Sequence, residues 1–591
     1  MTFKFFPNTL LSALALAGGL AAQPADAPVM PLTDLVPGQK GEVWTVFKGS
    51  RPEPFSVELT GVVRNALGPG KNLILCELTD PRVQNMGAVA GMSGSPLYID
   101  GKLVGVLSYQ IQRFETVRYA GFTPIADMLE ISSLPAALAP GVPSAIPVKG
   151  FREGRAALAS LTPADFQPLA PAFSMAGISP QVAGWFEPQF QALGLGATAL
   201  GGHAEGSQTE SLTTGVNLKP GDVVAAALAV GDISIAATGT VSVVDGKRVL
   251  AFGHPMLSLG ATELPMTAAQ VVTILPSQFN SVKVSNTGRV IGSFSQDRLS
   301  GVYGEIGRIP HLVPVEVELP ARLNRRTLHF AVARQEQILP LVAAAGLAQA
   351  VAGSNEAGFT RGFRLTTTVE FPGTEPFQLK QVYPGPQGFQ QGVAEFVGHL
   401  QQCLFNPFER TFPSHLRFSV EETPEVPVGY VEQLQVSRTR TEPGSTITAT
   451  INWHGFQHEE ESETLSVPVP AEWAGKDLEV VLVPGPALDE MTGHPKAPNP
   501  ADFRNFEEFL DTLRQRRATD GLYLAVVERT KLFSDAHALT PELPGSLERI
   551  AGRADDNRYQ KRDAVAPLWE TRLLAGRVFG TQFRRPLQVT E

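Results

Sequence analysis

Alternation of apolar and polar residues is clearest in the N-terminal part of the chain. Residues 42–47 and 55–59 alternate or nearly alternate in polarity, as strands with one buried face do. Two apolar runs follow at 72–78 and 102–107, and turns rich in Gly, Pro and Ser separate these segments. About six short strands suffice for one small barrel, so residues 31–130 are predicted to form a compact β unit.

A second β pattern occupies residues 211–312. Apolar segments on either side of Asp245-Gly246 predict a hairpin with an Asp-Gly turn. Between the two β regions, residues 131–210 are rich in Ala, Pro and Gly and are interpreted as a connector.

The pattern changes again after residue 312. Residues 313–420 combine strand-like segments with helical periodicity at 336–352 and 393–404, which indicates an α+β region. Regularly spaced strands with Pro-Gly turns are typical of a sandwich, and residues 421–500 are predicted to be immunoglobulin-like.

The last part of the chain, residues 501–591, is predicted to be a mixed helical C-terminal region. Asn499 has the right side chain to cap a helix, and Pro500 fits the first turn of that helix. A chain of 591 residues is too long for one core, so two to four domains are expected.

The first residues have the pattern of a secretory signal. Lys4 gives a positive start, residues 10–20 are apolar, and small residues follow at Ala21 and Ala22. This apolar core is too short to span a bilayer, and no later stretch is long and apolar enough to do so. Residues 1–22 are therefore predicted to be a signal peptide, and the mature protein is expected to be exported, periplasmic or secreted, without a membrane span.

Charge, cysteine content and the lack of ligand-binding motifs restrict the classes of function that are possible. The net charge is −10 and no block of Lys or Arg is present, so no nucleic-acid partner is expected. The two cysteines, Cys76 and Cys403, are interpreted either as buried free thiols or as one bridge. No phosphate loop or dinucleotide fingerprint occurs, and His454 and His458 do not form the helical zinc motif, so neither a cofactor nor a metal is expected.

The segment with the clearest chemical content is Gly-Met-Ser-Gly-Ser-Pro at 91–96, between two strand-like runs. A serine flanked by glycines in a tight turn can expose its hydroxyl and turn backbone amides toward one point. Acyl transfer needs both, a nucleophilic oxygen and donors for the oxyanion. Ordinary turns have the same composition, so the neighbouring sequence must distinguish a nucleophile turn from a structural one.

His254 follows the predicted hairpin directly, between Gly253 and Pro255. A histidine held at the end of a buried strand has little freedom, which suits a general base. The alternative is a histidine that is satisfied in the core or exposed on a loop.

Several segments together resemble the SpoIVB-type serine peptidases of bacterial sporulation. These are Leu-Thr-Asp-Pro at 78–81, the turn at 91–96 and the segment 100–105. In that family Thr-Asp-Pro precedes the Gly-Met-Ser-Gly-Ser-Pro turn, and a short strand pair follows it. The Gly-His context of His254 and the later Gly-Val-Tyr-Gly at 301–304 are similar to the same family. There the histidine half precedes the serine half, whereas here the serine half comes first.

The resemblance implies a mainly β fold, with a two-barrel chymotrypsin-like peptidase domain followed by a β-rich, immunoglobulin-like accessory region and a mixed C-terminal tail. The barrel at 31–130 would carry the nucleophile and the barrel at 211–312 the histidine, in swapped order. It implies Ser93 as nucleophile, His254 as general base, and the amides of Gly91 and Ser93 as the oxyanion hole.

Two carboxylates are candidates for the third member of the triad. Asp80 is favoured, because Thr79-Asp80-Pro81 matches the motif of the family. Asp297 follows His254 at about the separation found in chymotrypsin, but its neighbour Arg298 suggests a structural ion pair.

The favoured function is an exported serine endopeptidase that hydrolyses protein or peptide substrates through a Ser93-His254-Asp80 triad and an acyl-enzyme, without a cofactor. The alternative is a catalytically silent peptidase fold that acts as an exported binding or scaffolding module. The C-terminal sandwich is the expected place for a protein partner. The two barrels are predicted to pack side by side, with the Ser93 turn facing His254.

Overall fold

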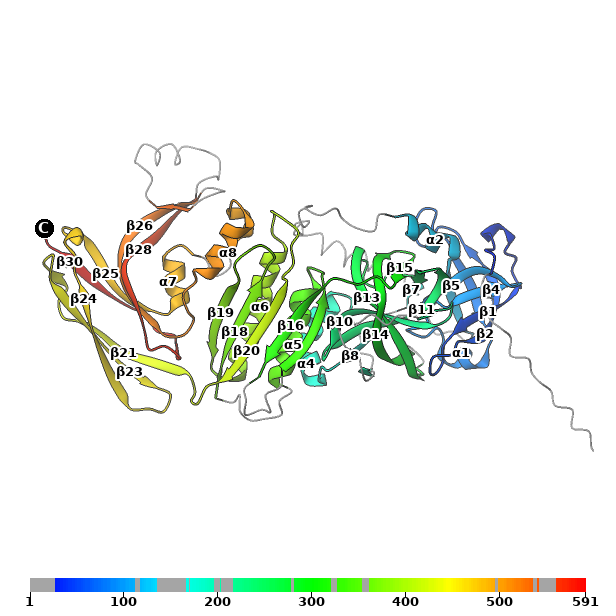
Figure 1. Cartoon of the computed structure of the whole chain (residues 1–591), viewed down its shortest axis with the longest axis horizontal. Coiled ribbons are helices and arrows are strands. Elements are labelled where there is room, and N and C mark those ends of the chain that lie inside the picture. The colour runs from blue at the N-terminus through cyan, green and yellow to red at the C-terminus, as the bar shows by residue number, and fades with distance from the viewer. Residues whose placement is uncertain are drawn as a thin grey trace, which may run out of the picture.

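The computed structural model arranges the chain along one axis, from an N-terminal barrel at one end to a C-terminal sandwich at the other (Figure 1). The residues that the structure describes are 27–111, 117–134, 166–169, 171–195, 202–203, 216–277, 281–319, 327–352, 361–494, 498–534, 539–541 and 560–591. The signal peptide predicted at 1–22 and most of the connector predicted at 131–210 lie outside them.

The N-terminal barrel confirms the β unit predicted from the alternating pattern. Phe55, Val57 and Leu59 lie on one face of a strand and fill its core. Short elements flank the barrel: η1 (Leu32–Asp34), α1 (Pro81–Met86), α2 (Ile125–Leu129), η2 (Glu130–Ser133) and β7 (Phe166–Pro168). The antiparallel strands, in pairing order, are β1 (Lys40–Thr45), β2 (Glu53–Val63), β3 (Leu73–Leu78), β6 (Tyr119–Pro124), β5 (Lys102–Ile111) and β4 (Pro96–Ile99), and β4 pairs again with β1.

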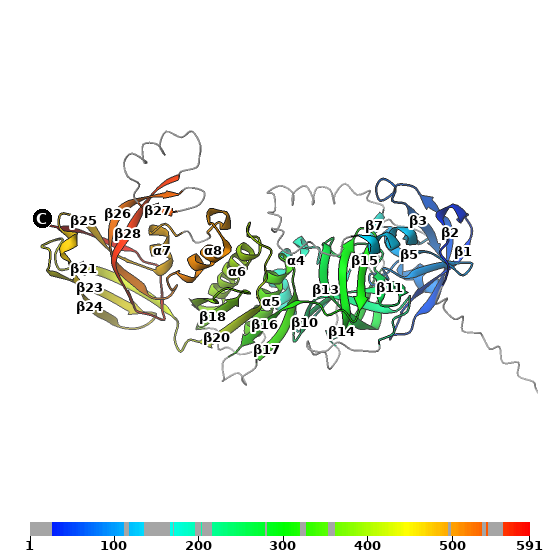
Figure 2. The ribbon, with the colours of Figure 1, turned by 45° about the horizontal axis from the view of Figure 1, so that its top comes forward.

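A second closed ring of antiparallel strands lies against this barrel (Figures 1 and 2). The predicted hairpin is confirmed here, because Asp245 pairs with Arg248 across a turn in which Gly246 has a φ of 59°. The strands, in pairing order, are β10 (Val223–Gly231), β13 (Gly260–Leu275), β14 (Val282–Arg298), β15 (Gly301–Ile306), β12 (Arg248–Ala251) and β11 (Ser234–Asp245), and β11 pairs again with β10. Two short strands join its sheet, β8 (Ala172–Ala176) on β11 and β9 (Gly202–His203) on β14.

The sheet of the second ring continues into the α+β region expected at 313–420. The region is therefore not a separate sheet, because β10 pairs with β17 as well as with its neighbours in the ring. The added strands, in pairing order, are β17 (Thr327–Ala333), β16 (Leu312–Glu318), β20 (His415–Glu422), β18 (Phe363–Glu370) and β19 (Phe377–Tyr383).

Helices cover one face of this extension. The helical periodicity at 336–352 and 393–404 is confirmed by α5 (Ile338–Ala352) and α6 (Gly385–Leu404). The helix α5 is apolar on every side because α4 (Pro180–Ala192), α6 and the sheet surround it.

The sandwich at the C-terminal end takes strands from both sides of residue 500. Trp453, Trp473 and Val480 belong to a core that the two sheets share. One sheet contains β24 (Glu460–Pro468), β23 (Thr446–Gly455), β21 (Val428–Val436) and β29 (Val578–Phe579). The other contains β22 (Arg440–Thr441), β30 (Phe583–Val589), β25 (Asp477–Val483), β26 (Leu522–Ser534), β27 (Leu539–Pro541) and β28 (Gln560–Leu573).

The helical segment before β26 begins later than the sequence predicts. Asn499 caps only the 3-10 turn η6 (Pro500–Asp502), whereas Asn505 accepts from the amide of Glu508 and caps α8 (Phe506–Arg514). The further short elements are η5 (Ala471–Trp473) and α7 (Gly485–Met491).

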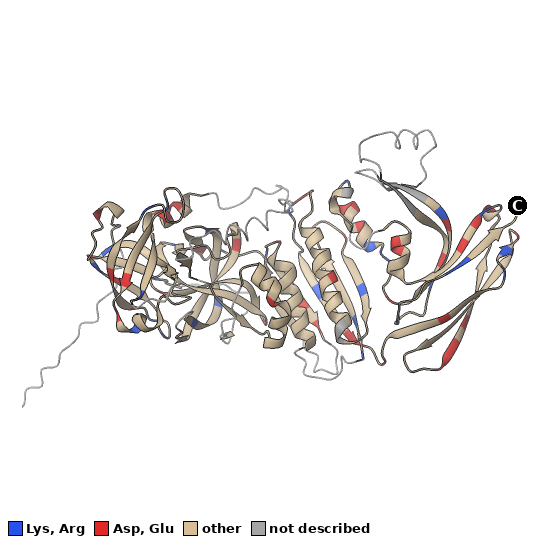
Figure 3. Cartoon of the chain, turned by 180° about the vertical axis from the view of Figure 1, so that it is seen from behind, with Lys and Arg blue, Asp and Glu red and all other residues tan. Residues whose placement is uncertain are grey.

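Cys76 and Cys403 are free thiols, buried in two different cores, so the bridge considered from the sequence is not formed. Burial raises the pKa of Cys76 to about 12. No helix among the described residues is long and apolar enough to cross a membrane. Positive and negative residues are interspersed along the chain (Figure 3).

Candidate active site

The turn that carries Ser93 is a tight loop between α1 and β4, closed by its own hydrogen bonds. The amide of Met92 donates to Val89 O (2.9 Å), and both the amide and the hydroxyl of Ser95 donate to Met92 O (3.0 and 2.6 Å). Gly91 and Gly94 each have a φ of 93°, a conformation that side-chain-bearing residues rarely adopt. The glycines on both sides of Met92-Ser93 are therefore required by the backbone.

Two backbone amides of this turn lack the hydrogen bonds that the neighbouring amides make. The amides of Ala90, Met92, Gly94 and Ser95 all donate to carbonyl oxygens, those of Ser281, Val89, Leu107 and Met92. Within the described part of the chain, the amides of Gly91 and Ser93 have no hydrogen-bond acceptor, although both residues are buried. Buried amides are almost always paired, so these two donors are available for an oxyanion.

The Ser93 turn is docked on β11 of the second ring. The amide of Thr240 donates to Ser93 O (2.8 Å), and the hydroxyl of Ser242 donates to Gly94 O (2.8 Å). A Cβ placed on Gly94 would lie 2.2 Å from Thr240 O and 2.5 Å from the amide nitrogen of Phe252. The turn therefore packs backbone to backbone against the segment that leads to His254.

The His254 segment is anchored on the first barrel in return. After β12 ends at Ala251, Phe252 and Gly253 have φ values of 70° and 68°, which turn the chain sharply. The hydroxyl of Thr123 donates to Gly253 O (2.7 Å). The segments that carry Ser93 and His254 thus both lie at the seam between the two barrels, which is formed by the contacts of Ser93 and Gly94 with β11 and of Thr123 with Gly253.

The hydrogen bond of His254 fixes its tautomer. Nδ1 lies 2.8 Å from Pro255 O, and because a carbonyl only accepts, Nδ1 carries the proton and Nε2 is left as an acceptor. Burial lowers the pKa of His254 to about 4, so the imidazole is neutral at pH 7. This is the protonation state that a general base needs.

Ser93 Oγ and His254 Nε2 are both buried and have no hydrogen-bond partner among the described residues. Both residues are 0% exposed. A hydroxyl donor and an imidazole acceptor are therefore buried at the seam without being bonded to each other. Together with the amides of Gly91 and Ser93, they form a set of polar groups that nothing in the described chain satisfies.

The carboxylate of Asp80 is engaged by Arg82. It caps α1 through the amide of Arg82 (2.8 Å) and pairs with the guanidinium at Nη2 (2.9 Å), which holds the pKa of Asp80 below its usual range. Arg82 also reaches Glu53 (3.1 Å). The hydrogen bonds that the Asp80 carboxylate accepts from described residues come from Arg82, so its place in a triad with His254 stays a prediction.

Asp297, the second carboxylate candidate, binds the loop after His254 instead of the imidazole. Its buried carboxylate accepts from the amides of Met256 (2.7 Å), Leu257 (2.8 Å) and Leu259 (3.0 Å). Burial raises its pKa, and these amides oppose that effect. Asp297 therefore fixes the loop 255–259. The carbonyl of Pro255, at the start of this loop, orients His254.

Lys283 lies beside the Ser93 turn and was not found from the sequence. Its side chain is 1% exposed, and Nζ donates to Thr45 Oγ1 (2.8 Å). The alternation of β14 puts Lys283 on the same buried face as Ser285 and Thr287, but a lysine in an alternating strand is normally assigned to the solvent side.

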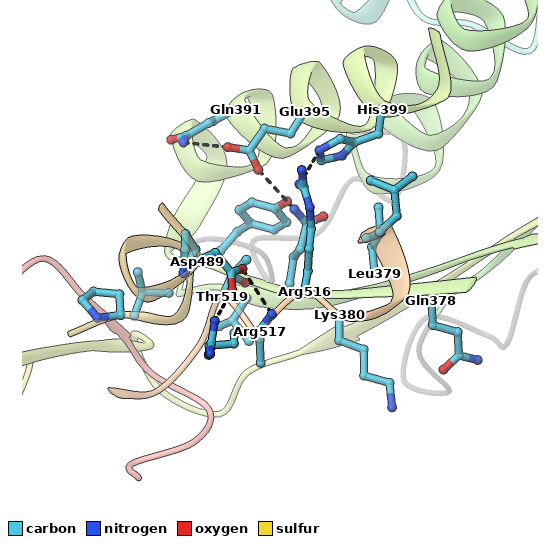
Figure 4. Close-up of a pocket in the computed structure, with 18 of the residues that line it drawn as sticks. Gln378, Leu379, Lys380, Gln391, Glu395, His399, Asp489, Arg516, Arg517 and Thr519 are labelled. Carbon is cyan, nitrogen blue, oxygen red and sulfur yellow. Dashed lines mark hydrogen bonds and ion pairs between the residues drawn. The ribbon is translucent and has the colours of Figure 1, made fainter. Parts of the chain in front are cut away.

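A pocket of about 1020 Å³ lies far from this seam, between α6, β19 and the segment 513–519 (Figure 4). Its charged side chains contact one another: Arg517 pairs with Asp489 (2.7 Å), and Arg516 donates to His399 Nε2 (2.7 Å). Neither Ser93 nor His254 lines it. This pocket is therefore separate from the site that holds Ser93 and His254.

Comparison with known proteins gives one family match, which covers the N-terminal barrel. Residues 23–126 match the family model described as SpoIVB peptidase S55. No curated protein and no solved structure matches the chain. The matched range contains Asp80, Gly91 and Ser93 and ends before His254, so the role of His254 depends on the geometry of the seam.

Proposed function

We propose that this chain, whose residues 23–126 belong to the SpoIVB peptidase S55 family of serine peptidases, is an exported endopeptidase that attacks peptide carbonyls with Ser93 and uses His254 as general base. The observation that carries the proposal is the set of unsatisfied buried groups at the seam. A hydroxyl, an imidazole acceptor and two amides are held there by backbone contacts from both barrels.

A two-barrel arrangement of the chymotrypsin type is supported by the two closed rings of antiparallel strands. The nucleophile turn belongs to the first ring and the histidine to the second, which is the reverse of the usual chain order. A triad depends on geometry and role, not on order, so the swap is chemically acceptable.

The reaction follows from the protonation states. His254 Nε2 takes the proton of Ser93 Oγ as the oxygen attacks the peptide carbonyl, and the amides of Gly91 and Ser93 donate to the oxyanion. The imidazolium then returns the proton to the leaving amine, and water releases the acyl-enzyme. The carbonyl of Pro255, held by the loop that Asp297 binds, orients the imidazole. Asp80 is the proposed carboxylate of the triad, and reaching His254 would require it to leave Arg82.

One observation favours the alternative of a silent scaffold. Ser93 and His254 are 0% exposed, so a substrate reaches them only if the seam opens. An enzyme of this kind would have a closed resting state, whereas a scaffold would never open.

Peptide cleavage distinguishes the two functions. The purified chain is incubated with a proteome-derived peptide library, and new termini are identified by mass spectrometry. An endopeptidase generates termini that are absent with a His254→Gln variant, since glutamine retains the volume and a donor for Pro255 O but is no base. A scaffold yields the same termini with both proteins, and that result would reject the proposed function.

The acid dependence of the site follows from the burial of His254. A folded-state pKa of about 4, below the usual value near 6.5, means that the imidazole stays neutral until the pH falls through 4. Below pH 6 we expect the rate at which a fluorophosphonate labels Ser93 to rise with pH, with a midpoint near 4. A midpoint near 6.5 would mean that His254 is solvated in the reactive state.

Export and partner binding complete the proposal. Residues 1–22 have the composition of a signal peptide, which supports a periplasmic or secreted location. The sandwich is the proposed contact for a protein partner, with protein or peptide chains as substrates of the barrel pair.

A further inference from the structure

Lys283 is a fully buried lysine for which the proposed mechanism has no use. Its Nζ donates to Thr45 Oγ1 of β1 (2.8 Å), and no carboxylate among the described residues offsets its burial. An ammonium group is costly to bury without a counter-charge. A lysine that is buried without a counter-charge beside the candidate nucleophile is a candidate for a functional role.

Lys283 contacts the part of the Ser93 turn that would hold an oxyanion. A Cβ placed on Gly91 would lie 3.1 Å from Lys283 Cβ and 3.3 Å from Lys283 Cδ, so the stem of the lysine runs along Gly91. The amide of Lys283 also donates to Ala90 O (2.9 Å). Nζ is two bonds beyond Cδ, which places the amino group within a few ångströms of the turn.

We propose that Lys283 is a positioning residue that acts through the Ser93 turn: its buried ammonium group, anchored on Thr45, favours the negative charge that develops at the Gly91 and Ser93 amides during acyl transfer. In a site shielded from water, a positive charge a few ångströms away is weakly screened, and it stabilises the negative charge on the oxyanion. The inference rests on the proposed function.

Burial is the cause of the shifted pKa of Lys283, because no charged group contacts its side chain among the described residues. Lys283 contacts Thr45 of β1 through Nζ and runs along Gly91 of the turn with its stem, and neither of these residues titrates. Burial lowers the pKa of Lys283 to about 7, and neither Asp80 nor His254 contributes to that shift. The ammonium is therefore present below pH 7 and is lost as the pH rises through 7.

The test is the pH profile of fluorophosphonate labelling of the full chain. In this reaction Ser93 Oγ attacks phosphorus, fluoride leaves, the proton goes to His254, and the phosphoryl oxygen occupies the oxyanion site. The wild-type rate is expected to fall by about tenfold or more as the pH rises through 7. With Lys283→Met the rate should be low at pH 6 and show no fall near pH 7. With Lys283→Arg the charge is permanent, so the rate should stay high to pH 9.

The outcomes separate this inference from the proposed function. A wild-type chain that is never labelled at Ser93 overturns both. A labelled wild type whose profile is reproduced by Lys283→Met, or one without a fall near pH 7, overturns the role of Lys283 alone. Thermal unfolding of each variant shows that it is folded, and removing a buried, unpaired charge is expected to leave the fold intact.

Discussion

Ser93→Ala is expected to abolish peptide cleavage, lowering kcat/KM by about 10⁴-fold or more, while leaving the protein at least as stable as the wild type. The loss follows from removing the nucleophile. The retained stability follows because Ser93 Oγ is buried without a partner, so alanine removes an unsatisfied polar atom and leaves no large cavity. Cleavage of the peptide library and thermal unfolding, measured on one preparation, check both parts.

Ser95→Ala is the matched control in the same turn. Its hydroxyl donates to Met92 O (2.6 Å), so its removal should cost about 1 kcal/mol of stability and leave most of the cleavage rate. If Ser95→Ala abolished cleavage and Ser93→Ala did not, the nucleophile would be misassigned. If both variants lost activity and unfolded, the turn would be structural only.

Gly94→Ala is expected to unfold or open the seam, with a loss of roughly 3 kcal/mol or more in the free energy of unfolding. The added Cβ would lie 2.2 Å from Thr240 O and 2.5 Å from the Phe252 nitrogen, and the φ of 93° is strained for alanine. Both contacts are with backbone, so no side chain can move aside. Chemical denaturation, followed by tryptophan fluorescence, measures the loss.

Gly101→Ala separates strain from steric clash. Gly101 also has a positive φ (71°) in the first barrel, but nothing lies within 4 Å of its added Cβ. Its cost should therefore be about 1 kcal/mol. Equal losses for Gly94→Ala and Gly101→Ala would contradict the close packing of the Ser93 turn against the second ring.

The features that could be predicted from the sequence are those set by residues close together in the chain. Alternation and turn residues predicted strands of the first barrel and the Asp245-Gly246 hairpin, and helical periodicity predicted α5 and part of α6. The glycines around Ser93 indicated a turn whose backbone requires them, and both have a φ of 93°. Ser93 and His254 were chosen from the residues next to them in the sequence, and their shared catalytic role stays a prediction.

Features that depend on long-range contacts were not predicted. The pairing of β10 with β17 joins the second ring to the α+β region, and β28 to β30 complete a sandwich begun near residue 428. Such pairings depend on complementary faces far apart in the chain, which leave no local pattern. The burial of Lys283 was not predicted either, because a lysine in an alternating strand is normally assigned to the solvent side.

Both carboxylates proposed for the triad are bound by other groups in the structure. Thr79-Asp80-Pro81 matches the family motif, but a neighbouring residue, Arg82, holds the carboxylate. Asp297 follows His254 at the expected separation, yet it binds the amides of the next loop. Spacing along the chain does not reveal which donors a carboxylate meets.

The most direct test of the account is the site of a fluorophosphonate adduct. The full-length chain is treated with the probe near pH 6, digested, and mapped by mass spectrometry beside the His254→Gln variant. One adduct is expected on Ser93 in the wild type, with a strong loss of that adduct in the variant, because an activated serine needs its base. No adduct on Ser93, or an adduct that forms equally fast without His254, would contradict it.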